Sequence, residues 1–451
     1  MKYPARFCIA GLLACLFTVT VGLTPARPAV KLKHSPLRGT RAATPAQSVT
    51  YNRNIAPILY RNCASCHHSG DIGPFPLMRY EDVKKRAQQI VAVTESRYMP
   101  PWRAQSHGEF DGERKLTTGQ IEIIRKWMES GAPEGIAADL PEAPVFPKEW
   151  ALGTPDFVGA PAAAYGLEAE GPDVYRCFVV PTHFSEDRYI STMEIRPGNR
   201  AIVHHVVACL DTTGLARRLE KASGGTGYTP KGSDINPSGA IGIWTPGNVP
   251  SSLPEGVGFL LPKGADIVLQ VHYSKSGKPE TDLTKIGLDF CKGPVDKQAR
   301  VVVLFQPYLD IPAGESNYIL RAFPMPTTDD VTILQVMPHM HLLGRTMTVT
   351  AKLPDRTQRA LINMADWSFR WQQTYRYKEP VKLPKNTVLT MTAHYDNSTQ
   401  NPNNPYHPPR RIKWGSLSTD EMCIAGLIYT SDSEHLTKGK TAAGFYGFGR
   451  F

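Results

Sequence analysis

The 451-residue sequence has little that would place it in a membrane or on a nucleic acid. Beyond its first 26 residues it has no long apolar run without charges, which excludes a multi-pass membrane protein. It has no run of five Lys or Arg residues and no basic stretch interleaved with aromatics, so the formal net charge of +10 does not indicate nucleic-acid binding. With 41% hydrophobic residues, the chain is too apolar to be wholly disordered.

Glycine and proline, by contrast, are abundant. The 37 Gly and 39 Pro residues predict many turns and few long helices, which favours a β-rich architecture. At roughly 100–200 residues per domain, the length suggests two to four domains.

The N-terminus has the pattern of a secretory signal peptide. Lys2 and Arg6 precede a charge-free apolar stretch from Phe7 to Ala26, and small residues follow it. We predict a signal peptide over residues 1–29, then a linker over residues 30–48, and a periplasmic or secreted protein. An uncleaved transmembrane anchor is the alternative, and only then would the protein be attached to a membrane. Cleavage removes three basic residues and no acids, so the net charge falls to +7.

A haem-attachment signature follows the linker. The segment Cys63-Ala-Ser-Cys66-His67 is a C-x-x-C-H motif. On a helix, positions i and i+3 share a face, so both thiols can reach the two vinyl groups of one haem, and His67 is then placed to bind its iron. A thioredoxin-like redox pair is the alternative, but no βαβ pattern surrounds the motif. We therefore predict one covalently attached haem c.

The neighbouring segments predict a small helical module. An amphipathic helix is expected over Tyr51–Leu59, a second from Tyr80 to about Glu95, and a third opening with the T-x-x-Q capping box at Thr117. With the haem motif, residues 49–138 resemble a class I c-type cytochrome domain, an all-α fold.

A methionine after the second helix is the candidate for the other axial ligand. Met99 is followed by two prolines, which stiffen its loop, so its thioether can be presented opposite His67. The alternatives are that Met99 is a core residue or that Met78 is the ligand. His68 and His107 are interpreted as surface residues.

The rest of the chain has the pattern of β-sandwiches. Residues 139–170 are rich in Pro and Ala and predict a semi-extended tether. After it, short β-type runs alternate with Gly/Pro turns, which favours antiparallel sheets, and the length requires two sandwiches, residues 171–298 and 299–451. The predicted strands are Tyr175–Val180, Tyr189–Ile195, Ile202–Leu210, Asp266–Tyr273, Arg300–Gln306, Thr332–Met337, Thr346–Lys352 and Val388–Tyr395.

The histidines of these two halves are arranged as metal ligands would be. His339 and His341, at i and i+2 of a strand, point to the same side and can converge on one metal. His204 and His205 are adjacent, so a metal that they share with His272 requires a bulge or local twist. Imidazoles suit several metals, and a thioether added to them selects for copper.

These residues resemble a known family. Tyr175-Arg-Cys177, Val203-His-His-Val206, Leu269-Gln-Val-His-Tyr273, Pro338-His-Met-His-Leu-Leu-Gly344 and Thr419-Asp-Glu-Met-Cys423 match, in order, the copper type II ascorbate-dependent monooxygenases. That family includes peptidylglycine α-hydroxylating monooxygenase and dopamine β-monooxygenase, and the resemblance spans roughly residues 171–440.

The resemblance implies a fold and a reaction. The fold would be two jelly-roll-like sandwiches, each with one copper ion, facing each other across a solvent-filled cleft. One oxygen atom of O₂ would enter a C–H bond of the substrate and the other would be reduced to water. The implied partners are O₂, an unidentified small-molecule or peptide-like substrate, and an electron donor, either an ascorbate-like reductant or a redox protein.

The resemblance also implies residue roles. His204, His205 and His272 would hold the electron-transfer copper. The copper that activates O₂ would be held by the catalytic set His339, His341 and Met422.

The sequence departs from the family at substrate contacts. Met337 stands where the peptide-hydroxylating member has an arginine for the substrate carboxylate, and Ile424 and Gly426 replace its Asn and Tyr. A peptide C-terminal glycine is therefore not the expected substrate. Gln270 matches a family residue near the active site.

The cysteines follow the family only in part. The resemblance implies a Cys177–Cys291 disulfide, whereas the usual partner of Cys423 is replaced by His394, which leaves Cys423 and Cys209 as thiols. His394 is interpreted as structural.

The leading hypothesis is therefore an exported copper monooxygenase that receives electrons through its own haem. The alternative is a non-catalytic electron-transfer cytochrome joined to a copper-binding or copper-sensing sandwich. A cell-surface adhesion module is a third possibility, which only the sandwich pattern favours.

Overall fold

The computed structural model describes residues 48–147, 149–231 and 238–442. The predicted signal peptide and residues 30–47 of the predicted linker lie outside the described residues. None of the helices in the described part has the length and apolar character needed to span a bilayer.

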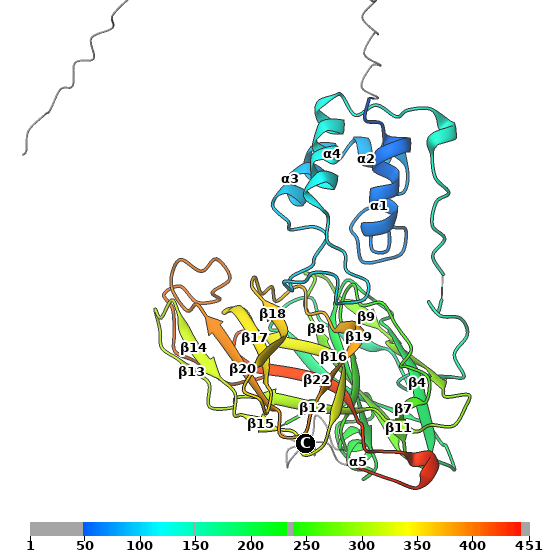
Figure 1. The fold of residues 1–451 in the computed structure, drawn as a ribbon, viewed down its shortest axis with the longest axis vertical. Helices are drawn as coiled ribbons and strands as arrows, with labels where there is room; N and C mark the ends of the chain where they lie inside the picture. The colour runs from blue at the N-terminus through cyan, green and yellow to red at the C-terminus, as the bar shows by residue number, and fades with distance from the viewer. Residues whose placement is uncertain (1–47, 148, 232–237, 443–451) are drawn as a thin grey trace, which may run out of the picture. The chain divides into compact units, whose positions relative to one another are not determined.

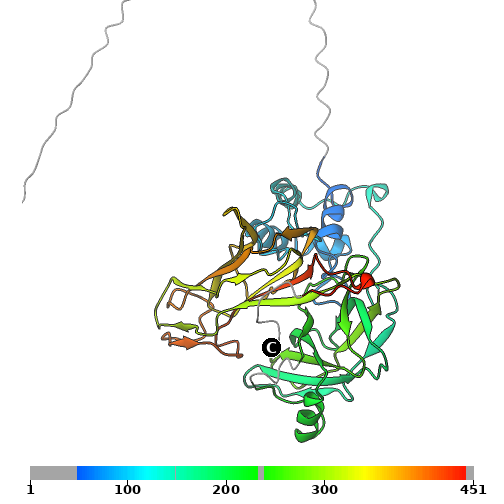
Figure 2. The ribbon, with the colours of Figure 1, turned by 60° about the horizontal axis from the view of Figure 1, so that its bottom comes forward.

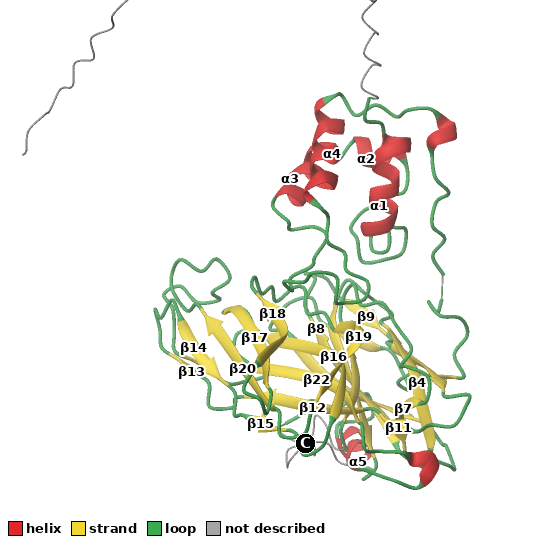
Figure 3. Ribbon diagram, viewed as in Figure 1, coloured by secondary structure: helices red, strands yellow, loops and turns green. Residues whose placement is uncertain are grey.

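The helices that precede residue 140 form one group, apart from the strands (Figures 1 and 3). Their core is built around the fully buried side chains of Leu59 and Trp127, with Tyr51 and Ile124 beside them. The elements are η1 (Tyr51–Ile55), α1 (Ala56–Asn62), α2 (Tyr80–Lys84), α3 (Ala87–Glu95), α4 (Thr118–Glu129) and η2 (Ala137–Asp139).

Two sequence predictions for these helices have different outcomes. The capping box is confirmed: the Thr117 hydroxyl accepts from the Gln120 N–H at 3.1 Å, and the Gln120 side chain accepts from the Thr117 N–H at 2.9 Å. The single helix expected from Tyr80 is instead two, because Arg86 leaves helical geometry with φ −118°. Its guanidinium lies 4.1 Å from the centre of the Phe75 ring.

The strands between residues 157 and 298 form two main sheets, drawn in cyan and green in Figures 1 and 2. One sheet has the order β1-β10-β4-β7-β11 and the other β3-β8-β5-β6, and apolar side chains between them form the first sandwich core. The elements are β1 (Phe157–Gly159), β2 (Tyr165–Leu167), β3 (Val174–Pro181), β4 (Arg188–Arg196), β5 (Val203–Asp211), α5 (Leu215–Ala222), β6 (Ala240–Trp244), β7 (Val257–Leu261), β8 (Asp266–Tyr273), β9 (Glu280–Asp282), β10 (Lys285–Phe290) and β11 (Lys297–Gln298).

The later strands build a second sandwich with its own core. Its main sheets have the orders β12-β22-β16-β19 and β14-β20-β17-β18, and β15 pairs with β20. The elements are β12 (Arg300–Phe305), β13 (Asp310–Ile311), β14 (Tyr318–Arg321), β15 (Met325–Pro326), β16 (Val331–Met340), β17 (Gly344–Lys352), β18 (Gln358–Met364), β19 (Tyr375–Leu383), β20 (Val388–Tyr395), β21 (Ile412–Lys413), β22 (Cys423–Ser431) and η4 (Leu436–Lys438).

The chain is mostly β-sheet, as expected, and all eight predicted strands occur, as β3, β4, β5, β8, β12, β16, β17 and β20. Two further strands, β1 and β2, fall within residues 139–170, where the composition predicts a tether. Each has three residues and is held by pairing, β1 with β10 and β2 with β9. So short a strand leaves no periodicity in the sequence, which is why the tether prediction extended too far.

A loop of the helical module is built into the second sandwich. Phe110 is 1% exposed and belongs to the second core, where its ring lies 5.4 Å from Tyr375 and 5.0 Å from Tyr377. The backbone of the loop is also bonded to the sandwich, because the Gln105 N–H donates to the carbonyl of Asn363 at 2.8 Å. The helical module is therefore anchored by this loop as well as by the connection after η2.

We predict that Phe110→Ala lowers the free energy of unfolding by about 3–5 kcal/mol, because it leaves a ring-sized cavity in the second core. Chemical denaturation of the full chain measures the effect. Phe323, which is 56% exposed, provides the control: Phe323→Ala should change stability by about 0.5 kcal/mol or less. Equal effects of the two substitutions would contradict the placement of Phe110.

Candidate functional site

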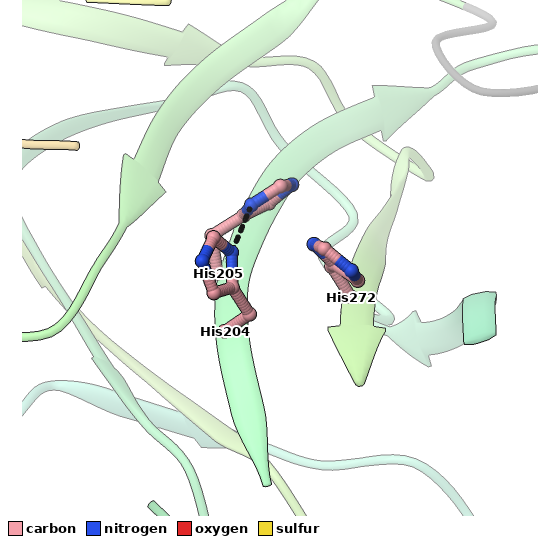
Figure 4. Close-up of side chains that lie close together, drawn as sticks. All are labelled: His204, His205 and His272. Atoms are coloured by element: carbon pink, nitrogen blue, oxygen red, sulfur yellow. Dashed lines mark hydrogen bonds between the residues drawn. The ribbon is translucent and has the colours of Figure 1, made fainter. Parts of the chain in front are cut away.

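Three histidines come together on the face of sheet β3-β8-β5-β6 that points away from the first core. His204 and His205 lie on β5 and His272 on the neighbouring β8 (Figure 4). Val203 on β5 pairs with Tyr273 on β8, and the next pair is His205 with His272. Between these two pairs β5 therefore has one more residue than β8. His204 is thus the extra residue of a β-bulge, the distortion that the adjacent pair requires.

The core residues of β5 show the same break in phase. Val203 and Val206 both enter the first core, three positions apart, whereas Val206, Ala208 and Leu210 follow the regular alternation. His204 and His205 lie in the interval where the alternation breaks, so neither enters the core.

The geometry of the three rings fits one metal ion. One ring nitrogen from each histidine lies within 4.8 Å of the others, and the Nδ1 atoms of His204 and His205 are 3.3 Å apart. Nδ1 of His272 is buried without a hydrogen-bond partner among the described residues. A buried, unpartnered nitrogen beside two further imidazoles is the donor set that copper or zinc takes.

Asp173 determines which nitrogen of His272 is available. The Asp173 carboxylate lies 2.8 Å from Nε2 of His272 and also accepts from the Ser418 hydroxyl at 2.6 Å. Burial alone would raise the pKa of Asp173, but these hydrogen bonds hold it below its usual value, so the group is a carboxylate. The proton of His272 then stays on Nε2, and the Nδ1 lone pair is free for a metal.

The second set lies on sheet β12-β22-β16-β19. The rings of His339 on β16 and His341 just after it are 5.2 Å apart. Nδ1 of His339 is 2.7 Å from the Gln372 side-chain oxygen, and Nδ1 of His341 is 3.2 Å from the carbonyl of Asp420. Both Nδ1 atoms therefore carry the proton, which leaves both Nε2 lone pairs as ligands.

Met422 directly precedes β22 of this sheet. The register pairs His339 with Ile424 and Met340 with Cys423, so the residue that comes next to His341 is Met422. Its carbonyl accepts from the Tyr395 hydroxyl at 2.9 Å, which fixes the backbone there, and its side chain is half-buried. The arrangement fits the predicted third ligand.

Burial keeps four of these histidines neutral. It lowers the pKa of His204 to about 3 and that of His339 to about 4, with neighbouring imidazoles acting in the same direction on both. The pKa values of His205 and His341 also lie well below the usual range, for the same reasons. Neutral imidazole is the form that binds a metal.

The two histidine sets are adjacent rather than separated. The His205 ring lies 6.1 Å from the His339 ring, and Phe369 stacks on His204 at 4.6 Å while its edge faces His341 at 5.7 Å. The expectation of a solvent-filled cleft between the sets is therefore wrong for this structure. Phe369 and Gln372, like Asp173, were not predicted, because nothing in their local sequence pattern points to the site.

The haem-attachment motif lies in a turn, not on a helix as expected. α1 ends at Asn62, and the N–H groups of Cys66 and His67 both donate to the carbonyl of Cys63, at 3.1 and 2.9 Å. Burial raises the pKa of Cys63 to about 12. The turn still brings both thiols and the imidazole into one short segment.

His67 is oriented as an axial ligand would be. Its Nδ1 is 3.0 Å from the Phe75 carbonyl, which places the proton there and leaves Nε2 for a metal. Gly73 packs against it so closely that a Cβ would lie 2.8 Å from Nδ1 of His67. These residues fit a haem.

Met99, the proposed opposite ligand, follows α3 and is half-buried, with its N–H bonded to the Val93 carbonyl at 2.9 Å. Its role, like that of Met78, stays a prediction. His107 is exposed as expected, whereas His68 stacks on Phe146 with ring centres 4.0 Å apart and is largely covered.

The predicted Cys177–Cys291 disulfide is wrong for this structure. Cys177 is buried with Tyr228 on the outer face of β3, whereas Cys291 follows β10 in the opposite sheet and contacts the Val257 carbonyl. The first core lies between them.

Four other residues singled out in the sequence are Cys209, Cys423, His394 and Gln270. Cys209 and Cys423 are buried thiols. His394 lies on β20 and is 3.0 Å from the Asn317 side-chain oxygen, which fits a structural role. Gln270 is buried on β8, two residues before His272 and on the same face.

Comparison with known proteins gives one informative match. Residues 304–441 match the family model of the copper type II ascorbate-dependent monooxygenase C-terminal domain, which supports the family for this part of the chain. No curated protein sequence gives a significant match.

Two solved structures are distantly similar to this chain. The major capsid protein P2 of bacteriophage PM2 has 9% identity and a TM-score of 0.26, with 65% of this chain and 99% of that chain covered. The infectious bursal disease virus VP2 subviral particle has 10% identity and a TM-score of 0.17, with 65% and 85% covered. Scores this low carry no inference about function.

We predict that Asp173→Asn weakens copper binding at the three-histidine set by about 10–100-fold, because the amide no longer holds the His272 proton on Nε2. Competition with a chromogenic copper chelator measures the affinity. Asp187→Asn, in the turn before β4, is the matched control and should leave the affinity unchanged. An unaltered affinity in Asp173→Asn would contradict the assigned role.

Proposed function

We propose that this protein is an exported copper-dependent monooxygenase that hydroxylates a C–H bond of an organic substrate with O₂. The observation that carries the proposal is the pair of adjacent, buried histidine sets, in which oxygen acceptors at Nε2 of His272 and at Nδ1 of His339 and His341 leave the other ring nitrogen free. The family match of residues 304–441, which includes His339, His341 and Met422, supports it.

Each set would hold one copper ion. Copper bound at these residues supplies one-electron transfer at the first set and O₂ activation at the second. His204, His205 and His272 are three nitrogen donors, whereas His339 and His341 are joined by the softer sulfur of Met422. The chemical difference between the donor sets favours different roles for the two ions.

The protein side chains exclude water and hold protons. Phe369 covers His204 and faces His341, which shields the ligands from solvent. Gln372 and Asp173 keep the protons of His339 and His272 on the nitrogens that face away from the metal positions. His272 and His339 are thus held in the tautomers that leave a ring nitrogen available for copper.

The helical module would carry a covalent haem c that delivers electrons. Cys63 and Cys66 would attach it, His67 would bind the iron, and Met99 would be the second axial ligand. The signal peptide over residues 1–29 would direct export to the periplasm or beyond it, where an ascorbate-like reductant or a redox protein is the donor.

We predict that the full chain binds two copper ions and consumes O₂ with a reductant and substrate. The His339→Ala variant should bind one copper ion fewer, and its rate of O₂ consumption should fall at least about 100-fold. The reason is that removing a metal ligand has a larger effect than removing a hydrogen-bond partner of that ligand. Metal analysis and an oxygen electrode measure the two effects. His394→Ala is the matched control and should keep both properties.

The result also separates the two hypotheses. Two bound copper ions with no O₂ consumption above that of the metal-free protein, across a broad substrate panel, would favour the non-catalytic electron-transfer module. Full activity in His339→Ala would contradict the proposed site itself.

We predict that protein made with a c-type haem maturation system keeps its haem after denaturation. Gly73→Ala should lower the bound haem and weaken the low-spin spectrum, because its Cβ would lie 2.5 Å from the Cys66 carbonyl and 2.8 Å from Nδ1 of His67. Absorption spectra of the reduced protein measure both. Gly119→Ala, whose Cβ meets its nearest atom at 3.9 Å, is the control. Wild-type protein without haem would refute the haem assignment.

A further inference from the structure

A cavity of about 840 Å³ lies where the helical module and both sandwiches meet. Its wall includes Val207, two residues after His205 on β5, and Met337, two residues before His339 on β16. Side chains two positions apart share a face and are separated by about 7 Å. The cavity therefore begins one side chain beyond the proposed metal ligands.

Gln373 is the unusual residue of this wall. It is 4% exposed, and neither its amide nitrogen nor its amide oxygen has a hydrogen-bond partner among the described residues. The hydroxyl of Thr374, next along the wall, is also buried without a partner. Buried polar groups are normally satisfied, so these atoms mark the place of a polar group that belongs to a ligand.

The neighbouring residue connects this place to the metal site. Gln372, directly before Gln373, is the residue whose oxygen holds the proton of His339. A polar group bound by Gln373 would therefore lie close to the His339 end of the cavity.

Charge along the wall identifies the sign of the ligand. Three arginines of the wall are paired with carboxylates: Arg196 with Glu194, Arg200 with Asp71, and Arg376 with Asp111.

Arg114 is the exception. Its Nη1 donates to the Gly247 carbonyl at 2.9 Å, its Nε is buried without a partner, and the described residues give it no carboxylate within ion-pair distance. A positive charge without a counterion in a cavity favours an anionic ligand.

Arg114 and Gln373 converge on one point. A Cβ at Gly247 would lie 3.4 Å from Nη2 of Arg114 and 3.7 Å from the side-chain nitrogen of Gln373. Both groups can therefore donate to a single small acceptor. Much of the remaining wall is apolar and includes Met193, Trp244, Met337 and Ile428.

We propose that this cavity binds a small carboxylic acid with an apolar body, whose carboxylate is held by Arg114 and the amide of Gln373. The inference rests on the proposed function, in that such an acid would be the substrate class of the monooxygenase. It assigns a residue of the helical module, Arg114, to substrate recognition. The C–H bond presented to the metal site would then lie near the carboxylate end.

The binding test uses 4-phenylbutanoate and 4-phenylbutylamine, probes with the same apolar body and opposite charge. Equilibrium dialysis is performed under nitrogen, so that the acid is not turned over, on the full copper-loaded chain kept reduced with ascorbate. Cu(I) prefers soft ligands and has little affinity for carboxylates. We expect the acid to bind at least about tenfold more tightly than the amine, since a charge-assisted hydrogen bond is worth that much.

Three substitutions test the two residues. Arg114→Met and Gln373→Leu should each weaken binding of the acid by about tenfold or more. Gln373→Glu should abolish the preference for the acid, because the new carboxylate would pair with the guanidinium of Arg114. Gln358→Leu and Arg359→Met, at exposed positions on β18, are the matched controls and should bind the acid like wild type. An unchanged copper content and melting temperature show that each variant is folded.

The outcomes distinguish this inference from the proposed function. Acid binding that depends on Arg114 and Gln373, without O₂ consumption, would support the site and refute the monooxygenase. Turnover of other substrates with no saturable binding of the acid at millimolar concentration would overturn the inference alone. Equal binding of acid and amine, or wild-type affinity in both Arg114→Met and Gln373→Leu, would also overturn it.

Discussion

The site depends on which face of its sheet each side chain of β5 and β16 occupies. β16 carries a bulge like that of β5, because Ile333 pairs with Tyr429 and Gln335 with Ile428, which leaves Leu334 as the extra residue. A shift of one residue moves every later side chain to the other face of the sheet. Without this bulge, His339 would continue the phase of Val331 and Ile333 and would point into the second core.

The two bulges also explain why the histidine sets are adjacent. Leu334, displaced from the second core, is buried in the first core, so one sandwich inserts an apolar side chain into the other. Asp173 in the first sandwich and Ser418 in the second are hydrogen-bonded across the same junction. Because apolar and polar contacts hold the sheets together there, the rings come within contact distance and water is excluded, which lowers the histidine pKa values.

The sequence could predict what depends on local pattern. The histidines, the eight strands, the capping box and the need for a distortion at His204 all follow from spacing along the chain. The partners of the histidines could not be predicted, because Asp173 lies 99 residues from His272 and Gln372 lies 33 residues from His339. The disulfide failed for a related reason: a pairing taken from the family assumes that both cysteines face the same side, and here the first core separates them.

The anchored loop changes how the helical module should be understood. A flexible tether would supply electrons to the copper site only through a raised local concentration. Phe110, buried in the second core, and the backbone bond between Gln105 and Asn363 instead fix the loop on the sandwich. The same loop continues to Arg114 at the cavity wall. One segment therefore both fixes the helical module on the sandwich and supplies the positive charge of the proposed binding site. A haem held by Cys66, itself part of the cavity wall, would then lie at a constant distance from the bound acid.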